Sequence, residues 1–100
     1  MTVTATVHSR KRMRQRLGRQ QSDGAIKNAL KSEETSPTVL YLRDRTNSGA
    51  IIKLYGGFIY IFKKHGPEYY KLLTVFPHMS LQETIRQQTY NRWYENWRNE

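Results

Sequence analysis

The chain has 100 residues, no cysteine and a formal net charge of +9. The length fits one domain, the missing cysteine excludes disulfides and thiolate zinc sites, and the basic excess indicates nucleic acid or an anionic membrane surface as partner. No apolar run approaches the roughly 18 residues of a membrane span, and the N-terminus lacks the apolar core of a signal peptide. We therefore expect a single soluble, cytoplasmic domain over residues 1–100, without a cofactor or a protein-held metal.

The first predicted element is a basic helix over residues 7–17. Thr6 is a residue type that caps helix N-termini, and Gly18 is a typical helix stop. Met13 and Leu17 are spaced four apart and form a narrow apolar seam on an otherwise basic circumference. The seam and the glycine favour a docked helix over the alternative, a disordered basic arm.

One stripe of this helix carries the candidate chemistry. At about 3.6 residues per turn, His8, Arg12 and Arg16 follow one another along a single side. Five lysines and arginines and no acid lie between residues 8 and 18. An imidazole and two guanidinium groups are thus presented to one elongated anion, most simply a phosphate backbone.

A second helix is expected over 23–32, and a four-stranded antiparallel meander over 38–76. The helix has Ile26, Ala29 and Leu30 at helical spacing. The strands are segments rich in β-branched and aromatic residues, separated by turn residues. They are expected at Thr38–Arg43, Gly49–Tyr55, Gly57–Lys63 and Tyr69–Phe76.

The Gly56-Gly57 turn sets the register of the central hairpin. If Tyr55 faces Phe58, opposed residues share a face and faces alternate along each strand. One face then holds aliphatic residues and the other mixes aromatic and basic residues. The expected aliphatic set is Leu40, Leu42, Ile52, Leu54, Ile59, Ile61, Leu73 and Val75. The expected mixed set is Tyr41, Arg43, Ile51, Lys53, Tyr55, Phe58, Tyr60, Phe62, Tyr70, Leu72, Thr74 and Phe76.

The last predicted element is a C-terminal helix over 80–97, opened by a capping box from Ser80 to Glu83. Its tryptophans fall at helical spacing, a pattern that is typical of residues buried in a hydrophobic core. Alternatively, Tyr90, Trp93 and Tyr94 form an interface for a protein partner or for self-association. The predicted fold is thus α+β, with two N-terminal helices, a four-stranded antiparallel sheet and one C-terminal helix.

The order of these parts resembles phage and bacterial toxin-type ribonucleases of the superfamily that groups barnase, EndoU, colicins E5 and D, and RelE. The resemblance covers about residues 7–77. Its motifs are His8, Arg12, Arg16 and Gly18 in the first helix, Ile51–Tyr55 and Ile59–Phe62 in the hairpin, and Leu72–Pro77 at the end of the sheet.

The resemblance implies a metal-independent hydrolase that cleaves RNA when a ribose 2′-hydroxyl attacks the adjacent phosphate. In that chemistry His8 is the acid or base, Arg12 stabilises developing charge, and Thr74 contacts the scissile phosphate. The face argument adds Lys53 and Tyr60, which fall beside Thr74. Further contacts to the RNA backbone are assigned to Arg16, Arg43, Lys63 and Lys71, although Lys71 is expected to point the other way.

Three alternatives to a ribonuclease remain open. One is a protein of the same fold that binds RNA or DNA without cleaving it. Another is a phage protein that inhibits a host nucleic-acid machine, as an anti-CRISPR protein does, acting in the host cytoplasm. The last is a basic arm on a membrane surface, which the predicted sheet argues against. Because His8 and Thr74 belong to one proposed site, the nuclease assignment requires them on the same opening of the fold.

Overall fold

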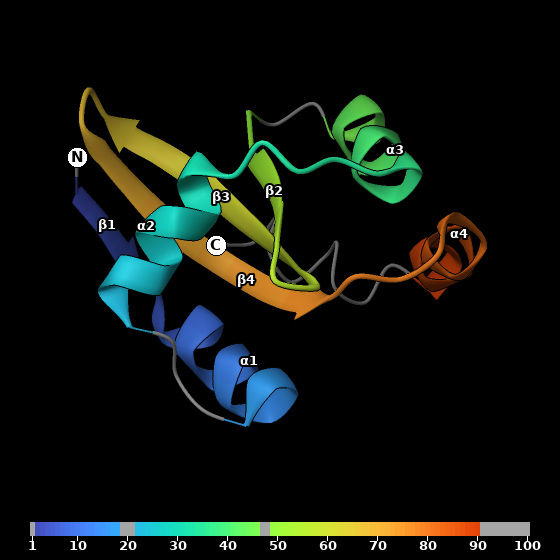
Figure 1. Ribbon diagram of the computed structural model, residues 1–100, viewed down its shortest axis with the longest axis horizontal. Helices are drawn as coiled ribbons and strands as arrows, with labels where there is room; N and C mark the ends of the chain where they lie inside the picture. The colour runs from blue at the N-terminus through green and yellow to red at the C-terminus, as the bar shows by residue number, and fades with distance from the viewer. Residues whose placement is uncertain (1, 19–21, 47–48, 91–100) are drawn as a thin grey trace.

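The computed structural model describes residues 2–18, 22–46 and 49–90 of the chain. Within these residues the fold is α+β, with helices placed between strands along the chain (Figure 1). The elements in order are β1 (Thr2–Ala5), α1 (Val7–Leu17), α2 (Asp23–Lys31), α3 (Pro37–Arg45), β2 (Ile51–Tyr55), β3 (Phe58–Gly66), β4 (Tyr69–Pro77) and α4 (Leu81–Tyr90).

The four strands form one mixed sheet in the order β1-β4-β3-β2. β1 runs parallel to β4, with Thr2 opposite Tyr69 and Ala5 opposite Leu72, whereas the other two pairs are antiparallel. The prediction of an antiparallel meander is therefore wrong. The parallel pair joins segments far apart in sequence, and local turn signals carry no information about such a pair.

The segment expected as the first strand, Thr38–Arg43, lies within helix α3. Ser36 caps this helix, because its side chain accepts a hydrogen bond from the Val39 amide at 3.2 Å. Pro37 occupies the first turn, where its missing N–H and fixed φ suit a helix. These start signals outweigh the β-branched composition of the segment. The predicted arrangement of two N-terminal helices followed by a sheet is corrected accordingly.

The other helices lie close to their expected ranges. Helix α1 covers the expected residues 7–17, and α2 ends at Lys31, one residue before the expected end. Helix α4 is described from Leu81 to Tyr90. The remainder of the segment expected to be helical as far as residue 97 lies outside the described residues.

The central hairpin has the predicted register, with Tyr55 opposite Phe58 and Lys53 opposite Tyr60. Both turn glycines have positive φ, of 59° and 81°, which the tight turn requires. The two faces of the sheet belong to different core clusters. One contains Val39, Leu42, Ile52, Leu54, Ile59, Ile61, Leu73 and Phe76, and the other contains Val3, Met13, Ile26, Ala29, Leu30, Tyr60, Phe62, Leu72 and Val75.

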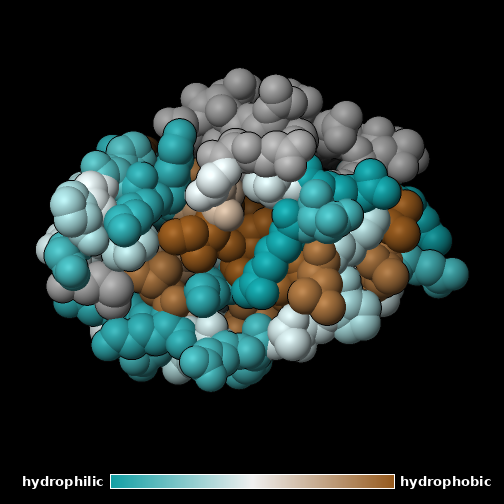
Figure 2. All heavy atoms as spheres, turned by 90° about the horizontal axis from the view of Figure 1, so that it is seen from above, coloured by the Kyte–Doolittle hydropathy of each residue, from teal (hydrophilic) through white to brown (hydrophobic). Residues whose placement is uncertain are grey.

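The helices cover both sides of this sheet. Cluster membership places α1 and α2 over one face and α3 over the other, with α4 beside α3 (Figure 1). Seen from above, apolar side chains gather in the middle of the molecule between hydrophilic borders (Figure 2). No helix in the described part of the chain is long and apolar enough to cross a membrane.

A β-bulge in β4 changes which side chains reach each face. Leu72 pairs with Phe62, and Thr74 pairs with Ile61, so one extra residue lies between two consecutive pairs. Beyond the bulge the alternation is shifted by one residue. Thr74 and Phe76 therefore lie on the face of Ile59 and Ile61, and Val75 lies on the face of Tyr60. The expected faces of these three residues are corrected.

Candidate nucleic-acid interface

The N-terminus of helix α1 is anchored to β4. The Thr6 amide donates to the Leu72 carbonyl at 3.2 Å, and the Thr6 hydroxyl accepts from the Ser9 amide at 3.0 Å. Gly18 ends the helix in the left-handed region with φ of 78°. Met13, 1% exposed, packs its side chain into the core. Because Met13 faces inward, the residues on the opposite side of the helix face solvent.

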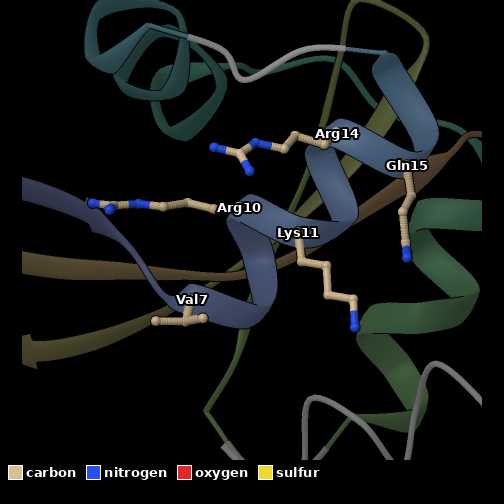
Figure 3. Close-up of a pocket in the computed structure, with 5 residues that line it drawn as sticks. All are labelled: Val7, Arg10, Lys11, Arg14 and Gln15. Carbon is tan, nitrogen blue, oxygen red and sulfur yellow. The ribbon is translucent and has the colours of Figure 1, made fainter.

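The outer side of α1 forms a shallow hollow of about 570 Å³. It is lined by Val7, Arg10, Lys11, Arg14 and Gln15. Figure 3 shows Arg10 and Arg14 extending in one direction from the helix and Lys11 and Gln15 in another. The hollow therefore lies between two rows of side chains, each about one helical turn long.

The electrostatics of this hollow favour an anion. Arg10, Lys11 and Arg14 are exposed, and no hydrogen bond or ion pair joins their side chains to another described residue. Helix α1 contains no acidic residue. Val7, 85% exposed, adds an apolar contact beside the cations. The side chains supply charge-assisted hydrogen-bond donors in two rows and no competing carboxylate. We call these five residues the α1 outer face.

The stripe expected to bind phosphate lies on the flank of α1, turned towards the sheet. Arg12 Nε donates to His8 Nε2 at 3.4 Å, and Arg12 Nη1 donates to Gln15 Oε1 at 3.1 Å. Arg16 Nη1 donates to the Val75 carbonyl at 2.7 Å. Burial, and after it the neighbouring Arg12, lowers the pKa of Arg16 to about 10. The Arg16 side chain is thus bonded to the edge of β4.

The structure does not bring the predicted catalytic residues together. Lys53 lies opposite Tyr60, as expected, but its Nζ donates to the Ser32 carbonyl at 3.2 Å at the end of α2. Tyr60 is 2% exposed, and burial, then the neighbouring Tyr55, raises the pKa of its phenol. Thr74 is also 2% exposed, and the bulge turns it to the face of the sheet opposite Tyr60. Helix α1, which carries His8, covers the Tyr60 face, so His8 and Thr74 do not share an opening and the condition set for the nuclease assignment is not met.

The remaining predicted contacts are a structural arginine and a pair of lysines. Arg43, on α3, donates from Nε and Nη2 to the Ile52 carbonyl at 3.1 and 2.8 Å, so it covers the outer edge of β2. Lys63 is exposed and lies directly opposite the half-buried Lys71. Of the predicted interface, Tyr90, Trp93 and Tyr94 lie outside the residues whose side chains the structure describes.

The exposed cations of the α1 outer face were not singled out by sequence reasoning, although a signal was available. Lys11 and Gln15 each lie two residues from Met13, about 200° away around a helix of 3.6 residues per turn. Taking Met13 as the buried position therefore points to the side of Lys11 and Gln15. It does not single out Arg10 and Arg14, which lie about 60° and 100° from Met13, as Arg16 and Arg12 do. The predicted stripe of His8, Arg12 and Arg16 lies instead on the flank of the helix.

Comparison with protein-family models, with curated proteins and with solved structures finds no match. The resemblance to toxin-type ribonucleases therefore rests on the sequence motifs alone. Among the described residues, no group of three or more histidines and carboxylates is placed to hold a metal ion.

Proposed function

We propose that this protein binds nucleic acid by its phosphate backbone through the α1 outer face. The observation that carries the proposal is the group Arg10, Lys11 and Arg14, which is exposed around one hollow and makes no ion pair within the described chain. Phosphate contacts from lysine and arginine supply most of the affinity for nucleic acid without regard to sequence. The net charge of +9 acts in the same sense by drawing polyanions to the molecule.

The geometry supports backbone binding better than recognition of base edges. The hollow is shallow, and its positive charges lie at the ends of long, flexible side chains. Base-specific contacts need side chains placed against base edges in a groove. We therefore expect affinity that depends strongly on salt and weakly on sequence. The proposed place of action is the cytoplasm.

Fluorescence anisotropy with a dye-labelled RNA, titrated at several salt concentrations, tests the proposal. The triple variant Arg10→Ala/Lys11→Ala/Arg14→Ala is expected to weaken binding by about 100-fold or more at low salt. A control variant removes the same charge elsewhere, at Lys27, Lys31 and Lys64. Equal losses in both variants would mean that net charge alone drives binding, and unchanged binding in the triple variant would contradict the proposal.

A second candidate function is metal-independent RNA cleavage at a site without Thr74, unlike the site that the resemblance implied. It is favoured by the contact between His8 and Arg12, which places an imidazole beside a guanidinium on the same helix as the proposed phosphate-binding residues. In this candidate His8 moves the proton and Arg12 stabilises the phosphorane charge. The buried Tyr60 and Thr74 are assigned to the core instead.

Incubation with RNA in EDTA distinguishes the two candidates. Cleavage that leaves 2′,3′-cyclic ends, and that His8→Ala abolishes while binding persists, would establish the enzyme. RNA that stays intact at protein concentrations that saturate binding would rule out cleavage and leave binding as the only proposed function.

A further inference from the structure

A second cationic surface lies on the side of the sheet opposite α1. Phe62 and Leu72 point into the core cluster that α1 and α2 cover. Because side chains alternate along a strand, Lys63 and Lys71 point to the other side. The two lysines are direct partners across β3 and β4.

The two opposed lysines repel each other. Directly opposed side chains on neighbouring strands have Cβ atoms about 5 Å apart, and like charges placed so destabilise a sheet. Neither lysine forms an ion pair with any residue that the structure describes. Strands β1, β3 and β4 contain no acidic residue. An anion from outside the chain would relieve the repulsion.

The surroundings of the pair add an aromatic ring and a hydroxyl. Thr4, on β1, lies opposite Lys71, and its Oγ1 is 3.0 Å from the hydroxyl of Tyr69. Tyr69 is two residues from Lys71 and so lies on the same side of β4. Tyr69 is 36% exposed, and the His65 ring meets its ring edge-on at 6.3 Å between centroids. Cations beside an exposed ring suit phosphates and stacked bases of a single strand.

We propose that Thr4, Lys63, Tyr69 and Lys71 form a second contact for the nucleic acid held by α1, and that the ligand is therefore single-stranded. This inference rests on the proposed function of the α1 outer face. The two surfaces lie on opposite sides of the sheet, and β1, the edge strand between them, leads directly into α1. One ligand reaches both only by bending round this edge. A single strand can bend this sharply, whereas a duplex stays stiff over roughly 150 base pairs.

Anisotropy with three dye-labelled RNAs tests the inference: single strands of about 15 and about 5 nucleotides, and a duplex of about 15 base pairs. The wild-type protein is expected to bind the long single strand most tightly. Lys63→Ala/Lys71→Ala is expected to weaken that binding about tenfold, through two lost phosphate contacts. Tyr69→Leu is expected to weaken it roughly tenfold through lost base stacking. Both effects should shrink for the short strand, which is held by α1 alone.

A control variant, Lys27→Ala/Lys31→Ala, removes the same charge from α2. Circular dichroism and melting curves check that each variant is folded, and Lys63→Gln/Lys71→Gln, which keeps the length of the side chains, replaces the alanine variant if it is not. Tighter binding of the duplex, or no effect of the Lys63/Lys71 and Tyr69 changes beyond the control, would overturn the inference and leave the α1 proposal standing. Wild-type protein that binds none of the three RNAs would overturn both.

Discussion

Arg16 on α1 donates a hydrogen bond of 2.7 Å to the main-chain oxygen of Val75 on β4. Val75 lies beyond Leu72, the last β4 residue paired with β1. The guanidinium also lies 5.9 Å from the centroid of the Phe76 ring. Arg16 therefore covers part of the edge of β4 that β1 leaves open. Its role in the fold is structural, although its residue type and spacing suggested a contact to phosphate.

Arg16→Ala is expected to lower the free energy of unfolding by about 1–3 kcal/mol, because the Val75 carbonyl loses a charged donor. The matched control is Arg14→Ala, two residues away on the exposed side, which should change stability by less than about 0.5 kcal/mol. Urea denaturation measures both. The effects on RNA binding should be reversed, with the larger loss in Arg14→Ala. Equal stability of the two variants would contradict the structural role.

Each cation of the α1 outer face should contribute to the salt dependence of RNA binding. For Lys11→Ala, the slope of log Kobs against log salt concentration is expected to become shallower by about 1, because one phosphate contact and its released counterion are lost. Binding titrations between about 50 and 200 mM salt measure the slope. Lys31→Ala, on α2, is the control and should leave it nearly unchanged. A Lys11→Ala protein whose slope equals that of the wild type would contradict a direct contact by Lys11.

Two glycine substitutions should have opposite effects on stability. Gly57 has φ of 81° in the hairpin turn, so Gly57→Ala forces an L-residue into the left-handed region and should cost about 1–2 kcal/mol. Gly24 lies in α2, and a Cβ there would meet only the Ser22 hydroxyl at 3.9 Å. Gly24→Ala should stabilise the protein by up to about 1 kcal/mol. Thermal melting of both variants checks the signs, and a stabilised Gly57→Ala protein would contradict the turn geometry.

Tyr60 should make stability fall at alkaline pH. Its raised pKa means that the folded protein keeps the phenol proton when the unfolded chain has released it, so the stability it contributes is lost as pH rises above about 10. The lowered pKa of Arg16 acts in the opposite sense over the same range. Comparison with Tyr60→Phe cancels the Arg16 contribution. Urea denaturation from pH 8 to 11 should show wild-type stability falling relative to Tyr60→Phe, and parallel curves would contradict the prediction.

Short-range signals determined several parts of this fold. The Gly56-Gly57 turn set the pairing of Lys53 with Tyr60, because a two-residue loop fixes which residues of the two hairpin strands face each other. The range of α1 followed from Thr6, Gly18 and the basic composition between them, since caps act on the adjacent turn. Features of this kind depend on residues a few positions apart and can be read from the chain directly.

Only the tertiary structure decided the rest. The parallel pairing of β1 with β4 joins residues 67 positions apart, as in Thr2 opposite Tyr69, and no local preference specifies such a partner. The bulge that turns Thr74 away from Tyr60 depends on how β4 fits β3, and it separated the predicted catalytic residues. Packing also chose which basic residues of α1 face solvent. Composition made the helix cationic, but its packing against β4 assigned Arg16 to the edge of the sheet and left Arg10, Lys11 and Arg14 exposed to solvent.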